Sequence, residues 1–589
     1  MSRTFNIATL LVEAARKWPE RLAVVSPHRP DVLGRGQLTY RDLDEASSRL
    51  AAWLLDQGPP QGSRLAVLVR PGADFVTVIF GLFKAGLVPV LADPGLGAAK
   101  LFHCLAEGRP SGLVGLPLAH LASLTAGGLA KKLKLRITVG RRWGWGGATL
   151  KSILNEPPVE SGGQGSLKPK TNLSDILKEP PGGPVELPVP TGADDLAALL
   201  FTSGSTGPAK GVVYTHAMFA AQVEAIREGL DIRPGGRDLA TFPLFALFAP
   251  ALGLTSITPD FNPTRPAKAA PRAIIEPILK HQVTSLFASP TLLSKLAAHA
   301  QERGLALPSL ERVISAGAPV PPKLVASFRP LLSPGAILET PYGATEGMPL
   351  TRLDDGEIIG RTRGLTEEGR GLCVGRPLPG VSLAVIRITD EALAGLSPDL
   401  LLPIGEIGEI IAQGPQVSPG YFDRPEDTAR SVIPGPDPAG PEKFWRRMGD
   451  VGWLDDEGRL WFCGRKAHRV VTGRGVLFSL PCEAVFNSHP LVRRSALVGV
   501  GSAEDRKPVI IVELKSRLRR SAWRGLAQEL AALAQANPRT AAIATFLRHP
   551  AFPVDPRHNA KINREALALW AEGVLGGGHV SIVCPWRLR

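Results

Sequence analysis

The chain has 589 residues, 44% of them hydrophobic and 21% charged, which is too long for one hydrophobic core and predicts at least two domains. Five scattered cysteines without a CxxC pair exclude a disulfide framework and a zinc cluster, and indicate a reducing compartment such as the cytoplasm. The net charge of +14 is uneven, because residues 464–589 hold 20 Lys and Arg against 8 Asp and Glu, whereas residues 1–463 hold 48 against 46. The basic C-terminal part suits an anionic ligand, but it lacks the interleaved aromatic residues of a nucleic-acid surface, so no nucleic-acid partner is predicted.

Strand and helix patterns alternate through the first three-quarters of the chain. The N-terminal stretch TFNIATLLVEAARK is typical of an amphipathic helix and lacks the apolar core of a signal peptide. Apolar runs predict strands at 64–70, 87–93, 283–289 and 311–317, and helical patterns occupy 73–86, 290–304 and 321–332. Strands followed by amphipathic helices predict an α/β fold, with parallel sheets covered by helices.

Two changes of pattern divide the chain. Residues 151–192 are rich in Pro, Gly, Ser and Lys without sustained periodicity, and are predicted to form a flexible insert. After Arg465 the pattern changes to short strands at 496–500 and 508–514 and helices at 521–536 and 563–573. We therefore predict a large N-terminal domain over 1–463, a small α+β domain over 464–573, and a tail over 574–589.

A loop dense in glycine and hydroxyl groups, TSGSTGPAKG, follows the apolar run 196–201. Glycines let backbone N–H groups approach a ligand closely, and the lysine adds positive charge, which together suit a phosphate. An ordinary hairpin turn has a similar composition. The candidate phosphate-binding residues are Thr202, Ser203, Gly204, Ser205, Thr206, Gly207 and Lys210.

The uncharged stretch between Asp238 and Asp260 has about the length of a membrane span. Pro243, Pro250 and Gly253 interrupt it, and such residues break a continuous helix. We therefore predict a buried or lipid-lining segment and no transmembrane helix.

The segment TPYGATEGMP (340–349) carries groups suited to a nucleotide. The Tyr342 ring can stack on a base, the Thr345 hydroxyl can bind phosphate, and the Glu346 carboxylate suits Mg²⁺. Each residue taken alone is also compatible with a structural role.

Two later segments add charged groups. In residues 446–470, Asp450 can accept the hydroxyls of a ribose, and Arg465 can bind ribose or phosphate through its planar guanidinium. In DPRHNAKINREAL, Lys561 lies between a loop and the start of a helix. A turn aspartate and an exposed helix lysine are the plain structural alternatives.

Together and in this order, the four segments resemble the superfamily of acyl-adenylate-forming enzymes, across about residues 4–573 outside the insert. TSGSTGPAKG is similar to its phosphate loop, and YGATE, which includes Gly343, to its adenine and Mg²⁺ segment. GDVGWLD and GRK are similar to its ribose segment and hinge, and NAKINR to its C-terminal catalytic lysine. The resemblance implies ATP and Mg²⁺, a mobile C-terminal lid, and attack of a substrate carboxylate on the α-phosphorus of ATP. Lys561, Glu346 and Thr345 would then be catalytic, with Glu346 at the metal.

Two departures narrow this resemblance. Ala246 stands where many acyl-CoA synthetases have an aromatic residue or His, and Ala467 stands where a hinge Asp or Lys is usual. The segments VGRRWGWGGATL, TFPLFALFAPALGL and HPAFPVDPRHNAKINREALALWA are similar to the subgroup that forms β-lactones in bacterial long-chain olefin biosynthesis. Phe245, Ala246 and Phe248 would line its acyl pocket.

This similarity implies that a 2-alkyl-3-hydroxy long-chain fatty acid is activated as acyl-AMP. The substrate's own hydroxyl then displaces AMP and closes the lactone. The alternative is a long-chain fatty acyl-CoA synthetase, or a fatty acyl-AMP ligase that loads a carrier protein. The implied partners are the thiolase, reductase and lactone decarboxylase of the same cytoplasmic lipid pathway.

Overall fold

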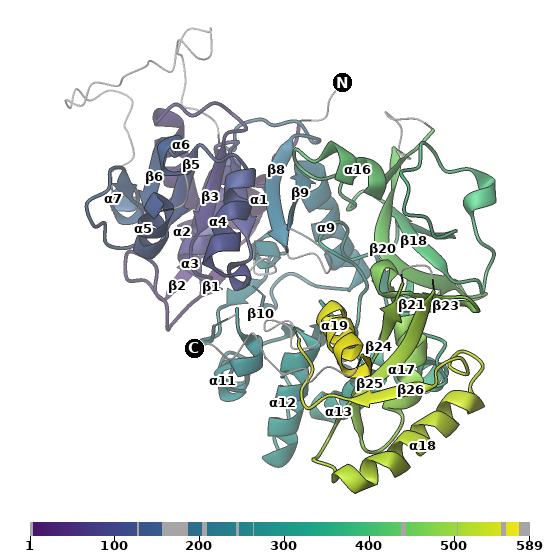
Figure 1. Cartoon of the computed structure of the whole chain (residues 1–589). Coiled ribbons are helices and arrows are strands. Elements are labelled where there is room, and N and C mark those ends of the chain that lie inside the picture. The colour runs from purple at the N-terminus through teal and green to yellow at the C-terminus, as the bar shows by residue number, and fades with distance from the viewer. Residues whose placement is uncertain are drawn as a thin grey trace, which may run out of the picture.

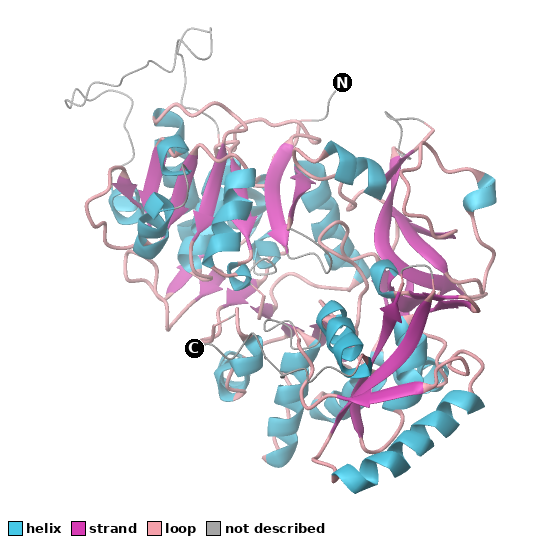
Figure 2. Cartoon of the chain, in the orientation of Figure 1, coloured by secondary structure: helices cyan, strands magenta, loops and turns pink. Residues whose placement is uncertain are grey.

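The computed structural model describes residues 4–576 apart from 126–128, 156–186, 203–208, 243–246, 263, 437–442, 503–504 and 555–560. A large N-terminal part contains three sheets, and a smaller C-terminal part lies against it (Figure 1). Helices cover the first two sheets, whereas mainly loops connect the strands of the third sheet (Figure 2).

The first sheet is parallel except at one edge, where β8 and β9 pair antiparallel. Its order is β7 (Ala148–Thr149), β6 (Leu135–Thr138), β5 (Gly112–Gly115), β3 (Arg64–Leu68), β4 (Val88–Ala92), β8 (Leu196–Thr202) and β9 (Lys210–Thr215). The associated helices are α1 (Thr9–Lys17), α2 (Tyr40–Asp56), α3 (Ala73–Lys84), α4 (Ala98–Glu107), α5 (Pro117–Thr125), α6 (Leu129–Lys132), α7 (Leu150–Asn155) and α9 (His216–Gly229).

The second sheet is also parallel, except that β1 and β2 pair antiparallel. Its order is β14 (Ile337–Glu339), β13 (Arg312–Ser315), β12 (Ser285–Ala288), β10 (Arg237–Ala240), β11 (Thr255–Ile257), β1 (Leu22–Val25) and β2 (Gln37–Thr39). Its helices include α10 (Phe248–Ala251), α11 (Arg272–His281), α12 (Pro290–Glu302) and α13 (Pro322–Phe328). Helix α3 is buried along nearly its whole length, because it lies in the core between the sheets.

The third sheet is antiparallel. Its strands are β15 (Thr351–Arg352), β16 (Leu372–Pro377), β21 (Leu460–Arg465), β20 (Phe444–Leu454), β18 (Gly408–Gln413) and β17 (Ser382–Ile386), with β19 (Val432–Pro434) paired to β20. Helix α16 (Pro425–Ser431) precedes β19.

The C-terminal part, which we call the lid, follows β21 directly. Its strands are β22 (Val470–Thr472), β23 (Gly475–Leu477), β24 (Val492–Gly501), β25 (Arg506–Leu514) and β26 (Thr545–Arg548), and its helices are α17 (Ser479–Asn487), α18 (Arg520–Ala536) and α19 (Arg564–Leu575). It has its own apolar core, in which Phe486, Ile510 and Leu530 are fully buried.

The predicted α/β fold with a small α+β lid is confirmed, but two details were wrong. Strand β24 is longer than the expected 496–500, because it pairs with β25 from Val492 to Gly501. Residues 151–155, expected to begin the insert, form most of α7 and bury Ile153 and Leu154. Their apolar side chains therefore anchor them in the N-terminal core.

The uncharged stretch between Asp238 and Asp260 supplies β10, α10 and β11 rather than one continuous helix. Within the described ranges, no helix combines the length and the apolar character needed to cross a membrane.

A buried carboxylate on β14 predicts how stability depends on pH. Glu339 is fully buried, and its Oε1 lies 3.1 Å from Arg352 Nη2. Burial raises the pKa of the Glu339 carboxyl from 4.5 to about 7. Between these pH values the folded state holds a proton that the unfolded chain has lost, so stability falls as pH rises.

We expect the wild-type free energy of unfolding to fall by up to about 3 kcal/mol between about pH 5 and pH 7.5, and Glu339→Gln to flatten this change. Urea unfolding at both pH values measures it. An equal pH dependence in the two proteins would exclude Glu339 as its source.

Candidate active site

A buried carboxylate joins the second and third sheets. Asp450 in β20 and Arg465 at the end of β21 are partners across an antiparallel strand pair. The Tyr342 hydroxyl, from the segment after β14, donates to Asp450 Oδ2 at 2.7 Å, and Arg465 Nη1 lies 3.0 Å from Asp450 Oδ1. The fold thus brings together three of the predicted nucleotide-binding residues.

Lys561 of the lid acts electrostatically on the same carboxylate. Burial raises the pKa of the Asp450 carboxyl, whereas the charge of Arg465, the hydrogen bond from Tyr342 and the charge of Lys561 lower it. Lys561 directly precedes Ile562, whose backbone pairs with Val554 ahead of α19. The lid therefore places its predicted catalytic lysine within electrostatic reach of the N-terminal site.

Glu346 lies in a tight turn at residues 344–347. Two backbone hydrogen bonds, one in each direction, join Ala344 and Gly347 and close this turn. The Tyr421 hydroxyl donates to Glu346 Oε1 at 2.8 Å. The neighbouring Thr345 is held through its carbonyl oxygen, which accepts from the Tyr214 hydroxyl at 2.7 Å. Contacts from two other segments therefore fix the turn that presents both predicted catalytic groups.

Two cations lie close to the Tyr421 ring. Lys210 Nζ is 5.1 Å from the ring centroid, and Arg446 Cζ is 4.5 Å from it. Lys210 also donates to Asp427 Oδ1 at 2.6 Å. Arg446 is fully buried, and its Nε and Nη2 find no hydrogen-bond acceptor in the part of the chain that the structure covers. An electron-rich ring face is a favourable neighbour for a cation, so Tyr421 stabilises both charges while it holds Glu346.

The predicted phosphate loop connects β8 to β9, and Thr202 pairs with Lys210 where the two strands meet. The loop residues Ser203, Gly204, Ser205, Thr206 and Gly207 lie outside the described residues. On the opposite segment, a Cβ added at Gly343 would meet the Gly347 carbonyl oxygen at 2.7 Å, so this close turn requires glycine.

An apolar cavity, which we call the inner pocket, adjoins Thr345. Its walls include Phe83, Leu91, Phe219, Phe242, Phe248 and Met348. The predicted acyl-pocket residue Phe248 therefore lines a real cavity, whereas Phe245 and Ala246 lie outside the described residues.

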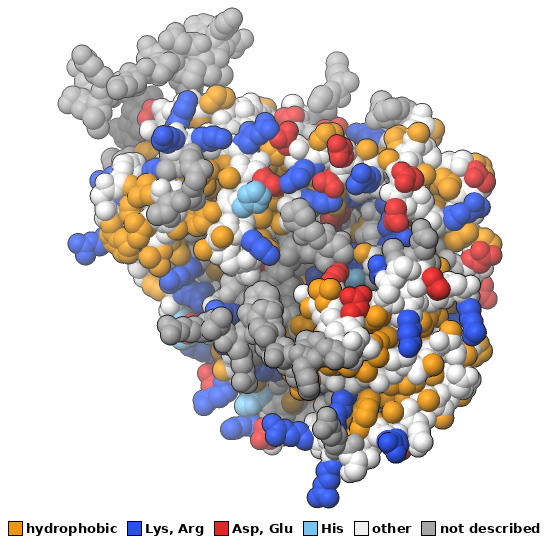
Figure 3. Space-filling model, viewed as in Figure 1, with side chains coloured by type: hydrophobic (Ala, Val, Ile, Leu, Met, Phe, Trp, Pro, Cys, Tyr) orange, Lys and Arg blue, Asp and Glu red, His pale blue; other side chains and the backbone are white. Residues whose placement is uncertain are grey.

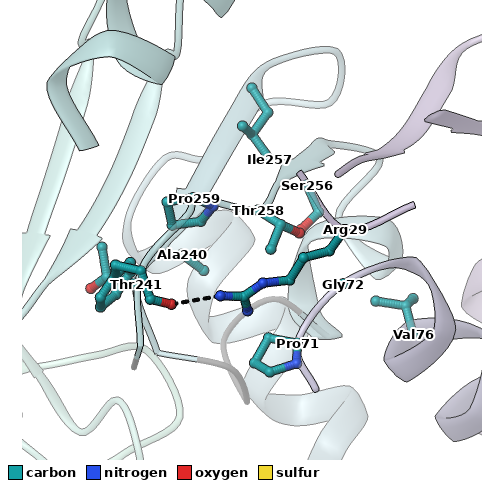
Figure 4. Close-up of a pocket in the computed structure, with 11 residues that line it drawn as sticks. Arg29, Pro71, Gly72, Val76, Ala240, Thr241, Ser256, Ile257, Thr258 and Pro259 are labelled. Carbon is teal, nitrogen blue, oxygen red and sulfur yellow. Dashed lines mark hydrogen bonds between the residues drawn. The ribbon is translucent and has the colours of Figure 1, made fainter. Parts of the chain in front are cut away.

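A second cavity, the edge pocket, lies where β10 and β11 end. Figure 4 shows Ala240, Thr241, Ile257 and Pro259 around it, with Val76 of α3 on another side. Its charged residue, Arg29, donates to the Phe261 carbonyl oxygen at 3.0 Å. Ligands of α/β folds commonly bind beyond the carboxyl ends of parallel strands, and this pocket lies at such a place.

The inner and edge pockets are close neighbours. Thr241 lines the edge pocket and the next residue, Phe242, lines the inner pocket. Val76 and Phe83 contribute to the two pockets from one face of α3, two turns or about 10 Å apart.

Residues 11–422 match the family model described as AMP-binding enzyme. The chain belongs to this family. It is 44% identical over 575 residues to the olefin beta-lactone synthetase of Xanthomonas campestris pv. campestris, covering 97% of this chain and 98% of that one. It is 45% identical over 581 residues to the olefin beta-lactone synthetase of Stenotrophomonas maltophilia, covering 98% and 99%.

The fold of this AMP-binding enzyme is also that of a solved structure. The O-succinylbenzoate coenzyme A synthetase of Bacillus subtilis, in complex with ATP and magnesium ion, superposes with a TM-score of 0.70 at 20% identity, covering 96% of this chain and 100% of that one. At this identity the likeness concerns the fold.

Sequence reasoning missed Tyr421 and Arg446. Tyr421 lies in SPGYFDRP, and its backbone forms a bridge to Val212 of β9, beside the predicted phosphate loop. The only local signal was an aromatic residue in a Gly/Pro-rich turn, which is common in loops. Arg446 shares its strand with the charged residues Arg447 and Asp450, so no distinct local signal marked it.

The two tyrosine–carboxylate hydrogen bonds predict unequal effects on stability. Tyr342→Phe removes the donor to a buried carboxylate and should lower the free energy of unfolding by about 1.5–3 kcal/mol. Tyr421→Phe removes the donor to the half-buried Glu346 and should cost less, because water can replace it. Urea denaturation of both variants measures the difference, and an equal or reversed order would contradict this account of the site.

Proposed function

We propose that this AMP-binding enzyme activates a 2-alkyl-3-hydroxy long-chain fatty acid with ATP and closes it to a β-lactone, releasing AMP and pyrophosphate. The observation that carries the proposal is the 44–45% identity to two olefin beta-lactone synthetases over almost the whole chain, lid included. A fatty acyl-CoA synthetase or carrier-loading ligase would share the adenylation residues, but the identity to the long-chain-fatty-acid–CoA ligase of Bacillus subtilis is lower, 25% over 84% of this chain.

The network around Asp450 fits the sugar and base of ATP. Asp450 Oδ1 is buried and finds no hydrogen-bond donor of good geometry among the described residues, so a ribose hydroxyl would satisfy it. Arg465 beside it would bind the ribose or α-phosphate, and the Tyr342 ring, held by its hydroxyl, would stack on adenine. Lys210 and the loop at 202–207 would hold the β- and γ-phosphates.

Glu346 fits a magnesium ion bound together with ATP. The described residues contain no cluster of three or more His, Cys, Asp or Glu side chains that could hold a metal by themselves. Mg²⁺ in nucleotide sites commonly takes one or two carboxylates together with substrate phosphates, so the Glu346 carboxylate is a sufficient protein ligand. When bound, the ion would neutralise charge on the departing pyrophosphate.

Lys561 would act at the reacting atoms. A substrate carboxylate oxygen attacks the α-phosphorus, the bond to the pyrophosphate oxygen breaks, and negative charge spreads over the phosphoryl oxygens. The ammonium group of Lys561 would hold the carboxylate and the α-phosphate together during this step. Its electrostatic influence on Asp450 is consistent with this position.

Ring closure needs no second substrate. The 3-hydroxyl oxygen attacks the acyl carbon, its proton passes to solvent, and AMP leaves with the electrons of the anhydride bond. Because the nucleophile belongs to the same molecule, its effective concentration far exceeds that of a free thiol.

The two apolar pockets would hold the two hydrocarbon chains that diverge from C2 and C3 of this substrate. The inner pocket adjoins Thr345 and would take one chain, and the edge pocket would take the other. Hydroxyl groups of the edge pocket are directed to protein partners, since Thr241 donates to the Phe287 carbonyl oxygen at 2.7 Å and Thr258 accepts from Ser26 at 2.8 Å. Apart from the guanidinium of Arg29, the remaining surface is largely hydrocarbon and suits an alkyl chain.

The thiolase, reductase and lactone decarboxylase of an olefin pathway are the proposed partners, because they would supply the hydroxy acid and consume the lactone.

The acceptor decides between the proposed function and its alternative. With ATP, Mg²⁺ and a 2-alkyl-3-hydroxy fatty acid, the wild type should yield AMP, pyrophosphate and β-lactone without CoA. Lys561→Ala should yield none of these while it nearly keeps the wild-type melting temperature, because a partly exposed lid lysine contributes little packing. Product NMR and ATP–pyrophosphate exchange measure both steps. Thioester formation only on addition of CoA, with no lactone in its absence, would favour the alternative.

A matched pair of substitutions tests the two pockets. Ala240→Leu narrows the edge pocket, and Ala198→Leu makes the same change in the inner pocket. Each should lower kcat/KM at least about tenfold for a substrate with two long chains. The kcat/KM of each variant should recover on a substrate in which one of the two chains is shortened to a methyl group. Shortening one chain should rescue Ala240→Leu, and shortening the other should rescue Ala198→Leu.

Equal losses on all substrates, with the fold intact, would show that the two pockets do not hold separate chains. Lactone formation by the wild type would be unaffected by that result, so the reaction and the pockets are tested independently.

A further inference from the structure

The free edge of the first sheet carries a surface with an unusual charge. Residues 108–155 contain eight Lys and Arg and no Asp or Glu. The segment runs from the turn before β5 through α7 and forms the end of the sheet farthest from β8 and β9. A stretch of this length without acidic residues is uncommon in a globular surface, where both signs are normally mixed.

Large apolar side chains are exposed on the same surface. Leu118, Leu121 and Leu124 of α5 are 64%, 47% and 51% exposed, and Trp143 in the following loop is 53% exposed. Leu118, Leu121 and Leu124 are spaced by three residues, so they line one side of α5. Figure 3 shows hydrophobic side chains gathered over the region where Figure 1 labels α5.

The tryptophan loop packs against α5. Trp145 stacks on His120 of α5 with ring centroids 5.3 Å apart, and Trp143 lies 6.0 Å from Trp145. Trp145 Nε1 also donates to Thr138 Oγ1 at 2.9 Å. The exposed leucines and Trp143 therefore belong to one preformed platform, defined here as Leu118, Leu121, Leu124 and Trp143.

Exposed basic residues belong to the same edge of the sheet as this platform. Two of them, Lys131 and Lys132, lie in α6. Arg141 and Arg142 directly precede Trp143, and Lys151 is an exposed residue in the first turn of α7. Exposed leucine and tryptophan with surrounding Lys and Arg are the groups that enter the interface of an anionic bilayer, where the apolar side chains meet the acyl boundary and the cations meet the lipid phosphates.

We propose that this platform docks the protein on the surface of a membrane that contains anionic lipids. The inference does not depend on the reaction catalysed. The absence of acidic residues over 108–155 favours a lipid surface over a protein partner of mixed charge.

Vesicle sedimentation with the full-length protein tests the proposal. The wild type should bind vesicles of phosphatidylglycerol and phosphatidylcholine, bind pure phosphatidylcholine much more weakly, and be released by high salt. Leu121→Glu and the double variant Arg141→Glu/Arg142→Glu should each reduce the partition coefficient at least about tenfold.

Two controls match these changes elsewhere on the surface. Ile404→Glu places the same charge on another exposed apolar residue, and Arg233→Glu/Arg272→Glu makes the same charge reversal at exposed arginines. Both controls should bind anionic vesicles nearly as well as the wild type. All variants should retain ATP–pyrophosphate exchange with a short, water-soluble acid.

Three results would overturn the proposal. The wild type could fail to bind anionic vesicles, or the controls could lose binding as strongly as the platform variants. Platform variants could instead change the oligomeric state of the protein in solution and leave vesicle binding unchanged, which would identify the platform as a protein–protein contact.

Discussion

The buried carboxylate of Asp450 constrains the arrangement of the whole site. A charge removed from water is costly unless it is paired and hydrogen-bonded, so Asp450 requires both Tyr342 and Arg465 in place. Tyr342 arrives from the second sheet and Arg465 from the last strand before the lid. The same contacts therefore fix the junction of two sheets and the point at which the lid leaves the N-terminal part.

Tyr421 supplies a second connection, from the phosphate-loop strand to the acidic turn. Its ring face stabilises Lys210 at the start of β9 and the buried Arg446 of β20, and its hydroxyl holds Glu346. One side chain thus links the three segments for which phosphate, metal and ribose binding are proposed. Arg446 is the less satisfied partner, because two of its nitrogens lack acceptors among the described residues and the ring partly compensates for their burial.

Local patterns predicted several strands of the first two sheets. The runs at 64–70, 283–289 and 311–317 form β3, β12 and β13, because fully buried parallel strands are nearly continuous in apolar residues. The motif residues Tyr342, Asp450 and Arg465 were also predicted as one site, and the fold brings them together.

Features that depend on distant pairing could not be read from the sequence. The antiparallel third sheet was not predicted, since its strands alternate with long loops and their register depends on partners far along the chain. Tyr421 contacts Glu346 across 75 positions, and no local signal marks that contact. The start of the insert was misplaced for a different reason. Helix α7 buries three apolar residues, Leu150, Ile153 and Leu154, and their burial outweighs the polar, Gly/Pro-rich composition on its C-terminal side.

The positions of the pockets and the platform suit a substrate with two long chains. Under the proposed function, anchoring both chains restricts rotation about the bond between C2 and C3, and this rotation decides whether the 3-hydroxyl faces the acyl carbon. Restricting it before AMP leaves lowers the entropic part of the barrier to ring closure.

Such an acid is also poorly soluble in water and partitions into membranes, where the basic, apolar surface at α5 would meet it. Figure 1 places α5 at the opposite side of the molecule from α18 of the lid, so docking through α5 would keep α18 away from the membrane.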